Sequence, residues 1–428
     1  MEICELGCGQ GRLRVRLPAG WPLVVAEAAS NAALPQGNAT VAEAMGRPLG
    51  APRLRHLAKG KRRAVLVHTD ASRPCPDAGL LGAVAAELEA AGLREISLLC
   101  ALGAHRAPTS QERRDKLGEL AARYPCHDHD CADPSALREL GVGPYGVPLV
   151  VSRLAAEADL VVSTGMVEPH QYAGYSGGAK TLAIGAAGEA TIAATHSPVM
   201  IDRPGCGPGL VAGNPFQEVI GEAARRAHLA FIVNVVRCGK GWACFAGAPE
   251  AAHRAAVEFA ARLVEVPVPA PFDIALCGVA GPKSRSLYQA TRAASYLALS
   301  PRPVLAPGAA IILACTLEDG SGGGPGELRF AAAMGSLAAG GPKALLARLR
   351  ARPLLPGEQR AYVTARVLEN HRLIVVSARP EPARHLGLEA ASSGEEALEL
   401  AATGLARPPR LLVLPDALSV LPRPKGAA

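Results

Sequence analysis

Three histidines in the 428-residue chain stand in sequence contexts that could support proton transfer or metal binding. They are His105 in ALGAHRAPT, His170 in EPHQYAG and His196 in EATIAATHSPVM. Histidine changes protonation near physiological pH, and its neutral ring nitrogen is a common metal ligand. Taken alone, its helical spacing from Ile192 would make His196 a core residue bonded to a backbone carbonyl. Together the three favour metal ligation or acid–base chemistry, and as a bare set they suggest zinc.

A glycine-rich turn at residues 174–181, GYSGGAKT, precedes a segment that we predict to be helical. Free backbone N–H groups at the start of a helix bind phosphate, so this turn is a candidate phosphate site. The Walker A motif requires glycine directly before its lysine, and Ala179 stands there before Lys180, so the spacing excludes a P-loop ATPase. The alternative interpretation of this segment is a tight surface turn that binds nothing.

Three apolar runs without alternation, at residues 64–67, 96–101 and 160–163, are typical of strands buried on both faces of a parallel sheet. A polar loop follows each run, and these loops carry in turn Asp70 with Arg73, then His105, then His170. Ligands in open α/β sheets bind beyond the carboxyl ends of the strands. We therefore predict that the three loops converge on one crevice.

The chain is expected to form two α/β domains with largely parallel sheets and an active site in the cleft between them. A length of 428 residues with 49% hydrophobic content exceeds what one core usually fills. The segment VPVPAP at residues 266–271 ends a helical pattern, and an apolar run at residues 272–279 begins a new strand. The predicted domains are residues 1–266 and 272–428, and the glycine-rich stretch at 319–326 is a flexible loop or a surface turn.

Bulk composition excludes several classes of protein. The net charge of +7 comes from arginines distributed along the whole chain, and only 4% of residues are aromatic, so a nucleic-acid surface is not supported. No apolar stretch approaches the roughly 18 residues of a membrane span, and residues 1–10 lack the pattern of a secretory leader. The eleven cysteines lie singly in apolar contexts, as reduced core thiols do. We expect a cytoplasmic protein without nucleic-acid or membrane partners.

Two other motifs imitate known sites and fail on spacing. ELGCGQGR at residues 5–12 is similar to the glycine loop of methyltransferases, but residues 13–17 alternate like a strand where a helix should begin. CHDHDC at residues 126–131 places potential ligands next to one another, without the loop spacing of zinc sites. We assign neither a function.

The motifs taken in order resemble the lactate racemase family, whose members depend on a nickel-pincer nucleotide. The resemblance begins at LGCGQGRLRVRLP, is densest at EPHQYAGYSGGAK, and extends over most of the chain. The other matching segments are HTDASRP, ALGAHRAPT, AGEATIAATHSPVM, GNPFQE and GPKSRSLYQATR.

This resemblance implies a cofactor in which a pyridinium mononucleotide holds nickel between two sulfurs and a carbon. Lys180 occupies the place of the lysine that carries the cofactor as a thioamide, and His196 that of the protein's nickel ligand. His105 and His170 would flank the substrate as alternate proton acceptor and donor, and the turn from Ser176 to Gly178 would hold the cofactor's phosphate. The resemblance also implies cofactor-making maturation enzymes as partners.

The carboxylate of a substrate requires a cation, and Arg73 is the first candidate because a guanidinium can hold it through two parallel hydrogen bonds. Gln289 and Arg292 are the next candidates. The family usually has lysine at the position of Arg292, so this departure puts lactate itself in doubt as the substrate. We expect Asp70 to be one of the cofactor-binding residues and to orient Arg73 or a catalytic histidine. The alternative is that Asp70 is an ordinary cap at the end of a strand.

The leading hypothesis is a racemase or epimerase that inverts C2 of a 2-hydroxy acid by hydride transfer. The C2 hydrogen is a very weak acid beside a carboxylate, so its movement as a hydride avoids a carbanion, while two bases on opposite sides serve inversion. One alternative is a zinc-dependent hydrolase or lyase with His105, His170 and His196 as ligands. Another is a non-catalytic protein that binds the cofactor or a hydroxy acid.

Overall fold

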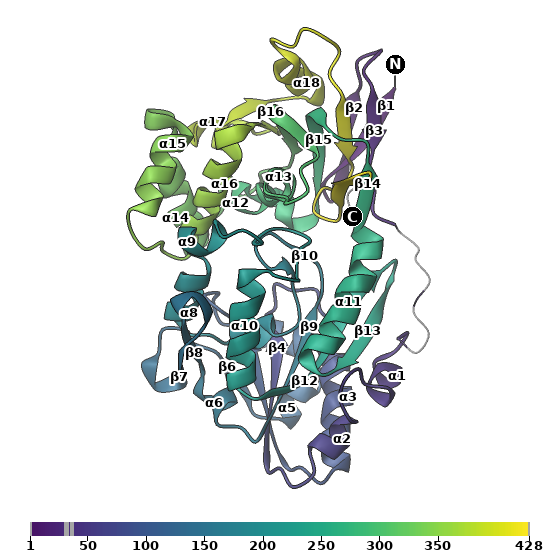
Figure 1. The fold of residues 1–428 in the computed structure, drawn as a ribbon, viewed down its shortest axis with the longest axis vertical. Coiled ribbons are helices and arrows are strands. Elements are labelled where there is room, and N and C mark those ends of the chain that lie inside the picture. Colours follow the sequence, from purple (N-terminus) through teal and green to yellow (C-terminus); the bar gives the residue numbers. More distant parts are fainter. Residues whose placement is uncertain (1, 30–33, 35–37, 427–428) are drawn as a thin grey trace.

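Two α/β units, each built on its own sheet, make up the computed structural model, which describes residues 2–29, 34 and 38–426 (Figure 1). The first sheet has six strands, of which β9, β4 and β5 are parallel neighbours. Its order is β13 (Gly241–Gly247), β12 (Leu229–Cys238), β9 (Leu160–Met166), β4 (Arg63–Thr69), β5 (Glu95–Ala101) and β6 (Cys126–Asp128). The apolar runs expected at residues 64–67, 96–101 and 160–163 are therefore strands of one parallel sheet, and that prediction is confirmed.

Helices cover this first sheet. The longer ones are α3 (Asp77–Ala90), α4 (Ser110–Leu117), α10 (Pro215–Arg226) and α11 (Pro249–Val264). Shorter helices are α1 (Val41–Gly46), α2 (Leu54–Leu57), α5 (Leu120–Arg123), α6 (Arg153–Ala156), α7 (Lys180–Ala183), α8 (Glu189–Thr195) and α9 (Pro198–Ile201). Two small hairpins, β7 (Leu137–Val142) with β8 (Pro148–Ser152) and β10 (Pro169–His170) with β11 (Gly174–Tyr175), complete the unit.

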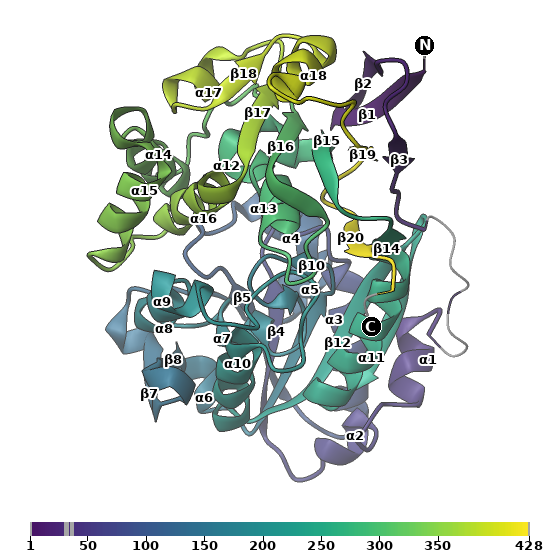
Figure 2. The ribbon, with the colours of Figure 1, turned by 45° about the horizontal axis from the view of Figure 1, so that its top comes forward.

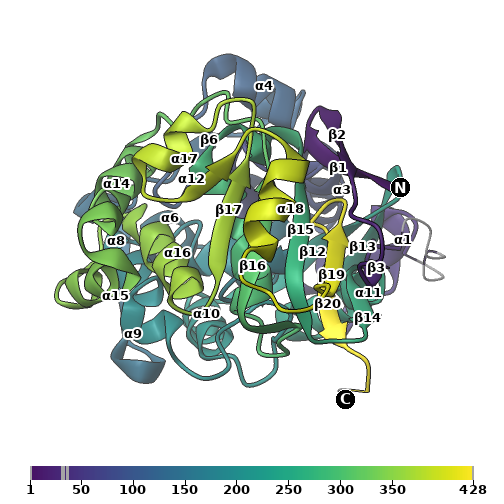
Figure 3. The same ribbon diagram turned by 90° about the horizontal axis from the view of Figure 1, so that it is seen from above.

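The second sheet is also mostly parallel. Its order is β18 (Glu389–Ala391), β17 (Arg372–Val376), β16 (Leu305–Ala314), β15 (Phe272–Ala280), β1 (Ile3–Gly9) and β2 (Gly11–Arg16), while β19 (Leu411–Leu414) joins β15 to β3 (Leu23–Val25). Its helices are α12 (Leu287–Ala290), α13 (Arg292–Ala298), α14 (Pro325–Met334), α15 (Leu337–Arg350), α16 (Glu358–Asn370), α17 (Glu381–His385) and α18 (Gly394–Ala402). Figure 2 shows α14, α15 and α16 grouped together, and Figure 3 shows α18 lying over β16 and β17.

The N-terminal strands belong to the second sheet, which corrects the expectation that residues 1–266 form one unit. Strand β1 pairs in parallel with β15 through Cys8 and Val279, while β1 and β2 form an antiparallel hairpin. Leu6 and Val15 are fully buried in the same apolar cluster as residues of strand β15. An isolated pair of strands is only marginally stable, so packing into this cluster stabilises the hairpin. The hairpin also confirms that ELGCGQGR is not a methyltransferase loop.

The start of the second unit agrees with the sequence at one point. Strand β15 begins at Phe272, where a new strand was expected. The preceding segment is not a bare linker, because β14 (Glu265–Val268) pairs with β20 (Leu421–Pro424) near the C-terminus.

Asp202 ties the two units together at the end of α9. Its carboxylate accepts hydrogen bonds from the Tyr362 hydroxyl at 2.5 Å and from Arg350 Nη2 at 3.0 Å, and Arg366 forms a further ion pair with it. These three partners come from α15 and α16 of the second unit. Bidentate and charge-assisted contacts of this kind are stronger than neutral hydrogen bonds.

We expect Asp202→Ala to lower stability by about 1–3 kcal/mol, because it leaves two guanidinium groups and a hydroxyl without their acceptor. The measurement is the thermal unfolding midpoint of the apoprotein. The control is Glu157→Ala, which removes the partner of the exposed ion pair with Arg153 and should change the midpoint little. Equal midpoints for the two variants would contradict the role given to Asp202.

Candidate active site

The polar loops after β4, β5 and β9 lie side by side at the carboxyl edge of the first sheet, as their sequence positions predict. Asp70 and Arg73 follow β4, His105 follows β5, and His170 lies in the hairpin after β9. Because β9, β4 and β5 are adjacent and parallel, their ends meet at one edge. We use the term junction for the region where the hairpin of β10 and β11 meets helices α13 and α16.

His105 is paired with Asp70. Its Nδ1 lies 3.3 Å from Asp70 Oδ2, and the backbone N–H of Ser72 donates to Asp70 Oδ1 at 2.7 Å. Burial raises the pKa of this carboxyl, but the bonds from His105 and Ser72 and the charge of Arg73 outweigh it and bring the pKa below its usual range. Because an ionised Asp70 accepts the proton on Nδ1, the lone pair of His105 is on Nε2. Asp70 thus orients a histidine, one of the two roles considered for it.

His170 has the opposite pattern of hydrogen bonds. The backbone N–H groups of Tyr172 and Ala173 donate to its Nδ1 at 3.3 and 3.1 Å. Burial, followed by the positive charges of Lys180 and Arg292, holds the pKa of His170 well below its ordinary value. Since Nδ1 is an acceptor, the neutral ring carries its proton on Nε2 and presents a donor there. The two histidines are therefore chemically different in this structure.

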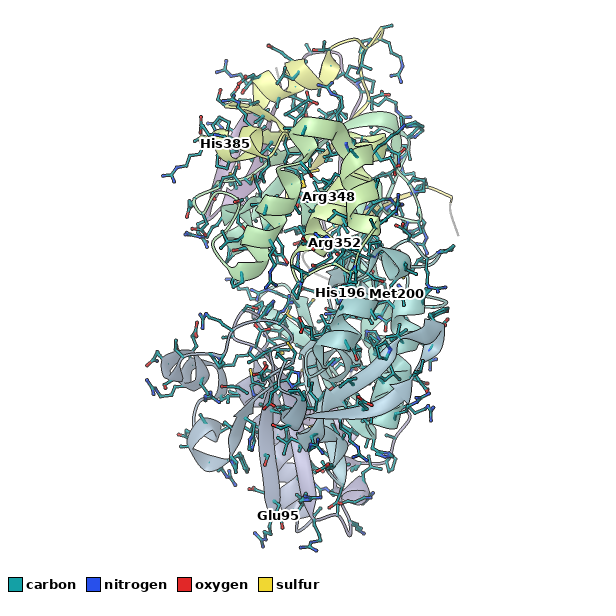
Figure 4. All side chains as sticks on the ribbon, turned by 90° about the vertical axis from the view of Figure 1, so that its left-hand side faces the viewer. Glu95, His196, Met200, Arg348, Arg352 and His385 are labelled. Atoms are coloured by element: carbon teal, nitrogen blue, oxygen red, sulfur yellow. The ribbon has the colours of Figure 1, made fainter. Side chains whose placement is uncertain are left out.

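His196 is arranged as a metal ligand would be. It follows α8, and its Nδ1 lies 2.9 Å from the Ile192 carbonyl oxygen, to which it donates. Burial and the charge of Lys180 lower the pKa of His196 to about 4, so the ring is neutral with an Nε2 lone pair free. A backbone carbonyl on the far nitrogen fixes a ligating histidine in this way. Figure 4 labels His196 at the level where the two halves of the molecule meet.

The charges of several site residues act on the amine of Lys180. Burial, then the charges of Arg73 and Arg292, lower the pKa of its amine to about 7, and Glu168 and Asp70 oppose this only in part. An amine with that pKa is about half unprotonated at pH 7, whereas an ordinary lysine is almost wholly charged. Lys180 is therefore a nucleophile suited to covalent attachment of a ligand.

The glycine turn before Lys180 is explained first by packing. Gly177 and Gly178 have positive φ angles, and a Cβ at Gly178 would lie 2.7 Å from the His253 ring. The Gly178 N–H donates to Asn234 Oδ1 at 2.7 Å, and the Ser176 hydroxyl donates to the Met166 carbonyl at 2.8 Å. These glycines are required for close packing whether or not the turn holds a phosphate.

The hairpin that carries His170 is held by the GNPFQE segment. Asn214 caps α10 by accepting from the Phe216 N–H, and its amide donates to the Tyr172 carbonyl at 2.7 Å. Gln217 Nε2 donates to the Ala173 carbonyl at 2.7 Å. This motif therefore fixes the backbone that bonds to His170.

Arg292 and Gln289 lie on α13 and α12 of the second unit. The positive charge of Arg292 acts on the pKa of both His170 and Lys180, which places its guanidinium near them. From the first unit, Arg73 Nη1 lies 3.9 Å from Glu168 Oε1. Gln289 is half-buried beside Tyr288, and its backbone N–H donates to the Ser286 carbonyl.

Sequence reasoning missed several residues at the junction, above all Arg360 and Tyr172, both 2% exposed. Helical spacing puts Arg360 on the same stripe as Val363 and Val367, which are buried. A guanidinium in an apolar stripe was the signal that could have singled out this residue. Asp77 was also missed: it is fully buried, pairs with Lys116 at 2.9 Å and accepts from the Thr69 hydroxyl, and so anchors the end of β4.

The zinc alternative lacks its ligand set. Among the residues that the structure describes, no three histidine, cysteine, aspartate or glutamate side chains are grouped so that they could hold a metal ion. His105, His170 and His196 do not converge on one point, and CHDHDC forms no such group either.

None of the helices in the described part of the chain has the length and apolar character of a membrane span.

Comparison with known proteins names the family of this two-unit α/β protein and shows that it is an isomerase. The family model of the lactate racemase N-terminal domain matches residues 8–207, and that of the C-terminal domain matches residues 269–422. The chain belongs to the lactate racemase family.

Two lactate racemases are similar to it along most of their length. The protein of Thermoanaerobacterium thermosaccharolyticum is 32% identical over 395 residues, which cover 90% of each chain. The protein of Lactiplantibacillus plantarum is 32% identical over 392 residues, covering 89% of this chain and 90% of the relative. The structure of the T. thermosaccharolyticum lactate racemase apoprotein superimposes with a TM-score of 0.89 at 29% identity, over 99% of this chain and 100% of that one.

A Thermotoga maritima protein of known structure supports the fold alone. Its TM-score is 0.63 at 21% identity, over 88% of this chain and 100% of that one. The expectations of the lactate racemase family and of two largely parallel α/β units are confirmed.

Acetylation of Lys180 should reach half of its maximal rate near pH 7, because a pKa of about 7 leaves about half of the amine unprotonated there. Peptide mass spectrometry of the briefly treated apoprotein measures this. Arg73→Gln should raise the pKa of Lys180 by removing a positive charge, and so slow the modification. An unchanged rate in that variant would show that Arg73 does not act on the amine.

The buried, neutral His196 should make the protein less stable in mild acid. Its folded-state pKa of about 4 lies below the ordinary 6.5, so the unfolded chain binds the proton more readily and stability falls as pH drops from about 6.5 toward 4. In His196→Asn the amide can still donate to Ile192 but does not titrate. The unfolding midpoint of this variant should fall less steeply with pH than that of the parent. The exposed His127→Asn controls for the loss of one imidazole, and parallel curves for parent and His196→Asn would contradict the assignment.

Proposed function

We propose that this protein is a racemase or epimerase that inverts C2 of a 2-hydroxy carboxylic acid with a nickel-pincer nucleotide tethered to Lys180. The observation that carries the proposal is that two suitable groups lie near each other. Lys180 is an amine with a pKa of about 7, and His196 has a free lone pair on Nε2. Covalent attachment needs the first and nickel ligation the second. The bound group would accept a hydride from C2 and return it.

The surrounding residues fit such a group in most respects. Lys180 would hold it covalently and His196 would ligate its nickel. The turn from Ser176 to Gly178 is proposed for its phosphate, although the Ser176 hydroxyl and the Gly178 N–H already have partners within the protein. The Ser176 N–H also donates, to the Glu168 carbonyl, which leaves the Gly177 N–H as the donor of this turn for which the described residues provide no acceptor.

Proton transfer at the substrate hydroxyl falls first to His105. Its Nε2 lone pair can accept the hydroxyl proton, and Asp70 stabilises the imidazolium that results. His170, neutral with a proton on Nε2, donates a hydrogen bond to the same oxygen from another side. For His170 to take its turn as acceptor, its proton must move to Nδ1, which requires release of the Tyr172 and Ala173 N–H groups.

Arg73, Arg292 and Gln289 are proposed to bind the substrate carboxylate. The two arginines come from different units, so the carboxylate would bridge the junction. Glu168 lies near Arg73 and keeps its side chain in place until the acid binds. We further propose that the protein works in the cytoplasm, after maturation by the enzymes that make the cofactor.

The test is protein expressed together with the cofactor-making enzymes. Intact-mass measurement should show added mass that maps to Lys180, with nickel bound, and Lys180→Ala should lack both. Single-enantiomer 2-hydroxy acids should be converted to the opposite enantiomer. In D2O the product should keep its C2 hydrogen, because an internally returned hydride does not exchange with solvent; deuterium at C2 would contradict the hydride route.

His105→Ala and His170→Ala test the acid–base roles in the same preparation. Each should lower the rate by roughly 10²–10⁴-fold while the added mass at Lys180 remains. Retained inversion in both variants would contradict the roles of the histidines. Binding of hydroxy acids without inversion in the loaded parent would instead identify a non-catalytic binder.

A further inference from the structure

Arg360 is a buried charge without a counter-ion among the described residues. Its side chain is 2% exposed in the first turn of α16, and Nη1 donates to Gln171 Oε1, an uncharged amide. Its guanidinium also lies over the Tyr288 ring, 5.5 Å from the centroid, while Nε has no hydrogen-bond partner. A buried guanidinium is costly unless an anion pairs with it, so its position calls for one.

Two further donors beside Arg360 are also without partners. Arg292 Nε and the Tyr172 hydroxyl are buried, and neither donates a hydrogen bond to an acceptor in the described structure, although the Gln171 side chain approaches the Tyr172 oxygen. Both lie close to Arg360. The positive charge of Arg360 acts on the pKa of Tyr172, and the positive charge of Arg292 lowers the pKa of Arg360. Buried polar groups in folded proteins almost always have partners, so three unpaired donors at one place indicate a ligand with several acceptor oxygens.

The position of these donors relates them to the proposed reaction. Arg292 acts electrostatically on both His170 and Arg360, so it lies near the acid–base group and near the buried cation. A substrate carboxylate at Arg292 and Arg73 places C2 near His170, and the rest of the acid then extends toward Arg360. A methyl group there, as in lactate, would leave Arg360 buried and unpaired.

We propose that the substrate is a 2-hydroxy dicarboxylate, whose second carboxylate is bound by Arg360 and the Tyr172 hydroxyl. This inference rests on the proposed function and names the class of acid on which the site acts. Gln171, which also accepts from the Ser295 hydroxyl at 3.3 Å, holds Arg360 in place before the acid arrives. An anionic part of the cofactor is the other possible source of the same charge, and the experiment separates the two.

The first experiment compares 2-hydroxybutanedioate with 2-hydroxybutanoate, which differ only in the second carboxylate. The matured protein should convert the dicarboxylate with kcat/KM roughly 10- to 150-fold higher, the factor expected for one buried charge-assisted contact. Equal values, or faster conversion of the monocarboxylate, would overturn the inference. Conversion of the monocarboxylate alone would still leave the racemase itself intact.

Variants locate the second carboxylate. Arg360→Met should remove the preference by lowering kcat/KM for the dicarboxylate alone, whereas the exposed Arg14→Met should leave it unchanged. Tyr172→Phe keeps the buried ring, and should weaken the dicarboxylate preference severalfold even if Arg360→Met does not fold. Loss of nickel and of the added mass at Lys180 in Arg360→Met, with the preference unaltered in Tyr172→Phe, would assign Arg360 to the cofactor and overturn the inference.

Calorimetry on the apoprotein gives a readout that does not need turnover. 2-Hydroxybutanedioate should bind more tightly than 2-hydroxybutanoate, and Tyr172→Phe should reduce that difference. Equal affinities would overturn the inference. If neither acid is converted by cofactor-loaded protein, the proposed function fails, while the calorimetric preference still decides whether Arg360 binds a second carboxylate.

Discussion

The burial of several positive charges close together at the junction governs the chemistry of this site. Arg73, Lys180, Arg292 and Arg360 are brought close together, and Asp70 and Glu168 offset their charge only in part. Burial and the neighbouring positive charges lower the pKa of Lys180 to about 7, so this amine is the member of the group that loses its proton near neutral pH. Burial, reinforced by neighbouring charges of this group, keeps His170 and His196 neutral, as proton transfer and metal ligation require. An apoprotein built in this way stores repulsion that bound anions relieve.

Much of the site could be predicted because it follows from how parallel sheets are built. Strand ends meet at one edge, so Asp70, His105 and His170 could be placed together from three apolar runs and the loops after them. The lysine and the helix with His196 follow in the same stretch of chain. These are local patterns joined by one rule of topology.

Other features could not be read from the sequence because they depend on distant contacts. The hairpin of β1 and β2 joins β15 through long-range pairing, which no local pattern reveals. The different proton positions of His105 and His170 depend on a carboxylate in one case and on two backbone N–H groups in the other. Arg360 becomes a ligand candidate only when its neighbours are known to lack any acid. The phosphate turn is a different case, because packing against His253 already requires its glycines.

The membership of the N-terminal strands in the second sheet has a consequence for how the molecule is made. During synthesis, Cys8 leaves the ribosome long before Val279, its partner in the sheet. The first unit can fold in the meantime, since its six strands are complete by Gly247. The hairpin must remain unpaired with its apolar face uncovered, a state in which strand edges are prone to misassociation. The second unit is therefore completed only after synthesis of the C-terminal half, since its sheet contains both the N-terminal hairpin and β19.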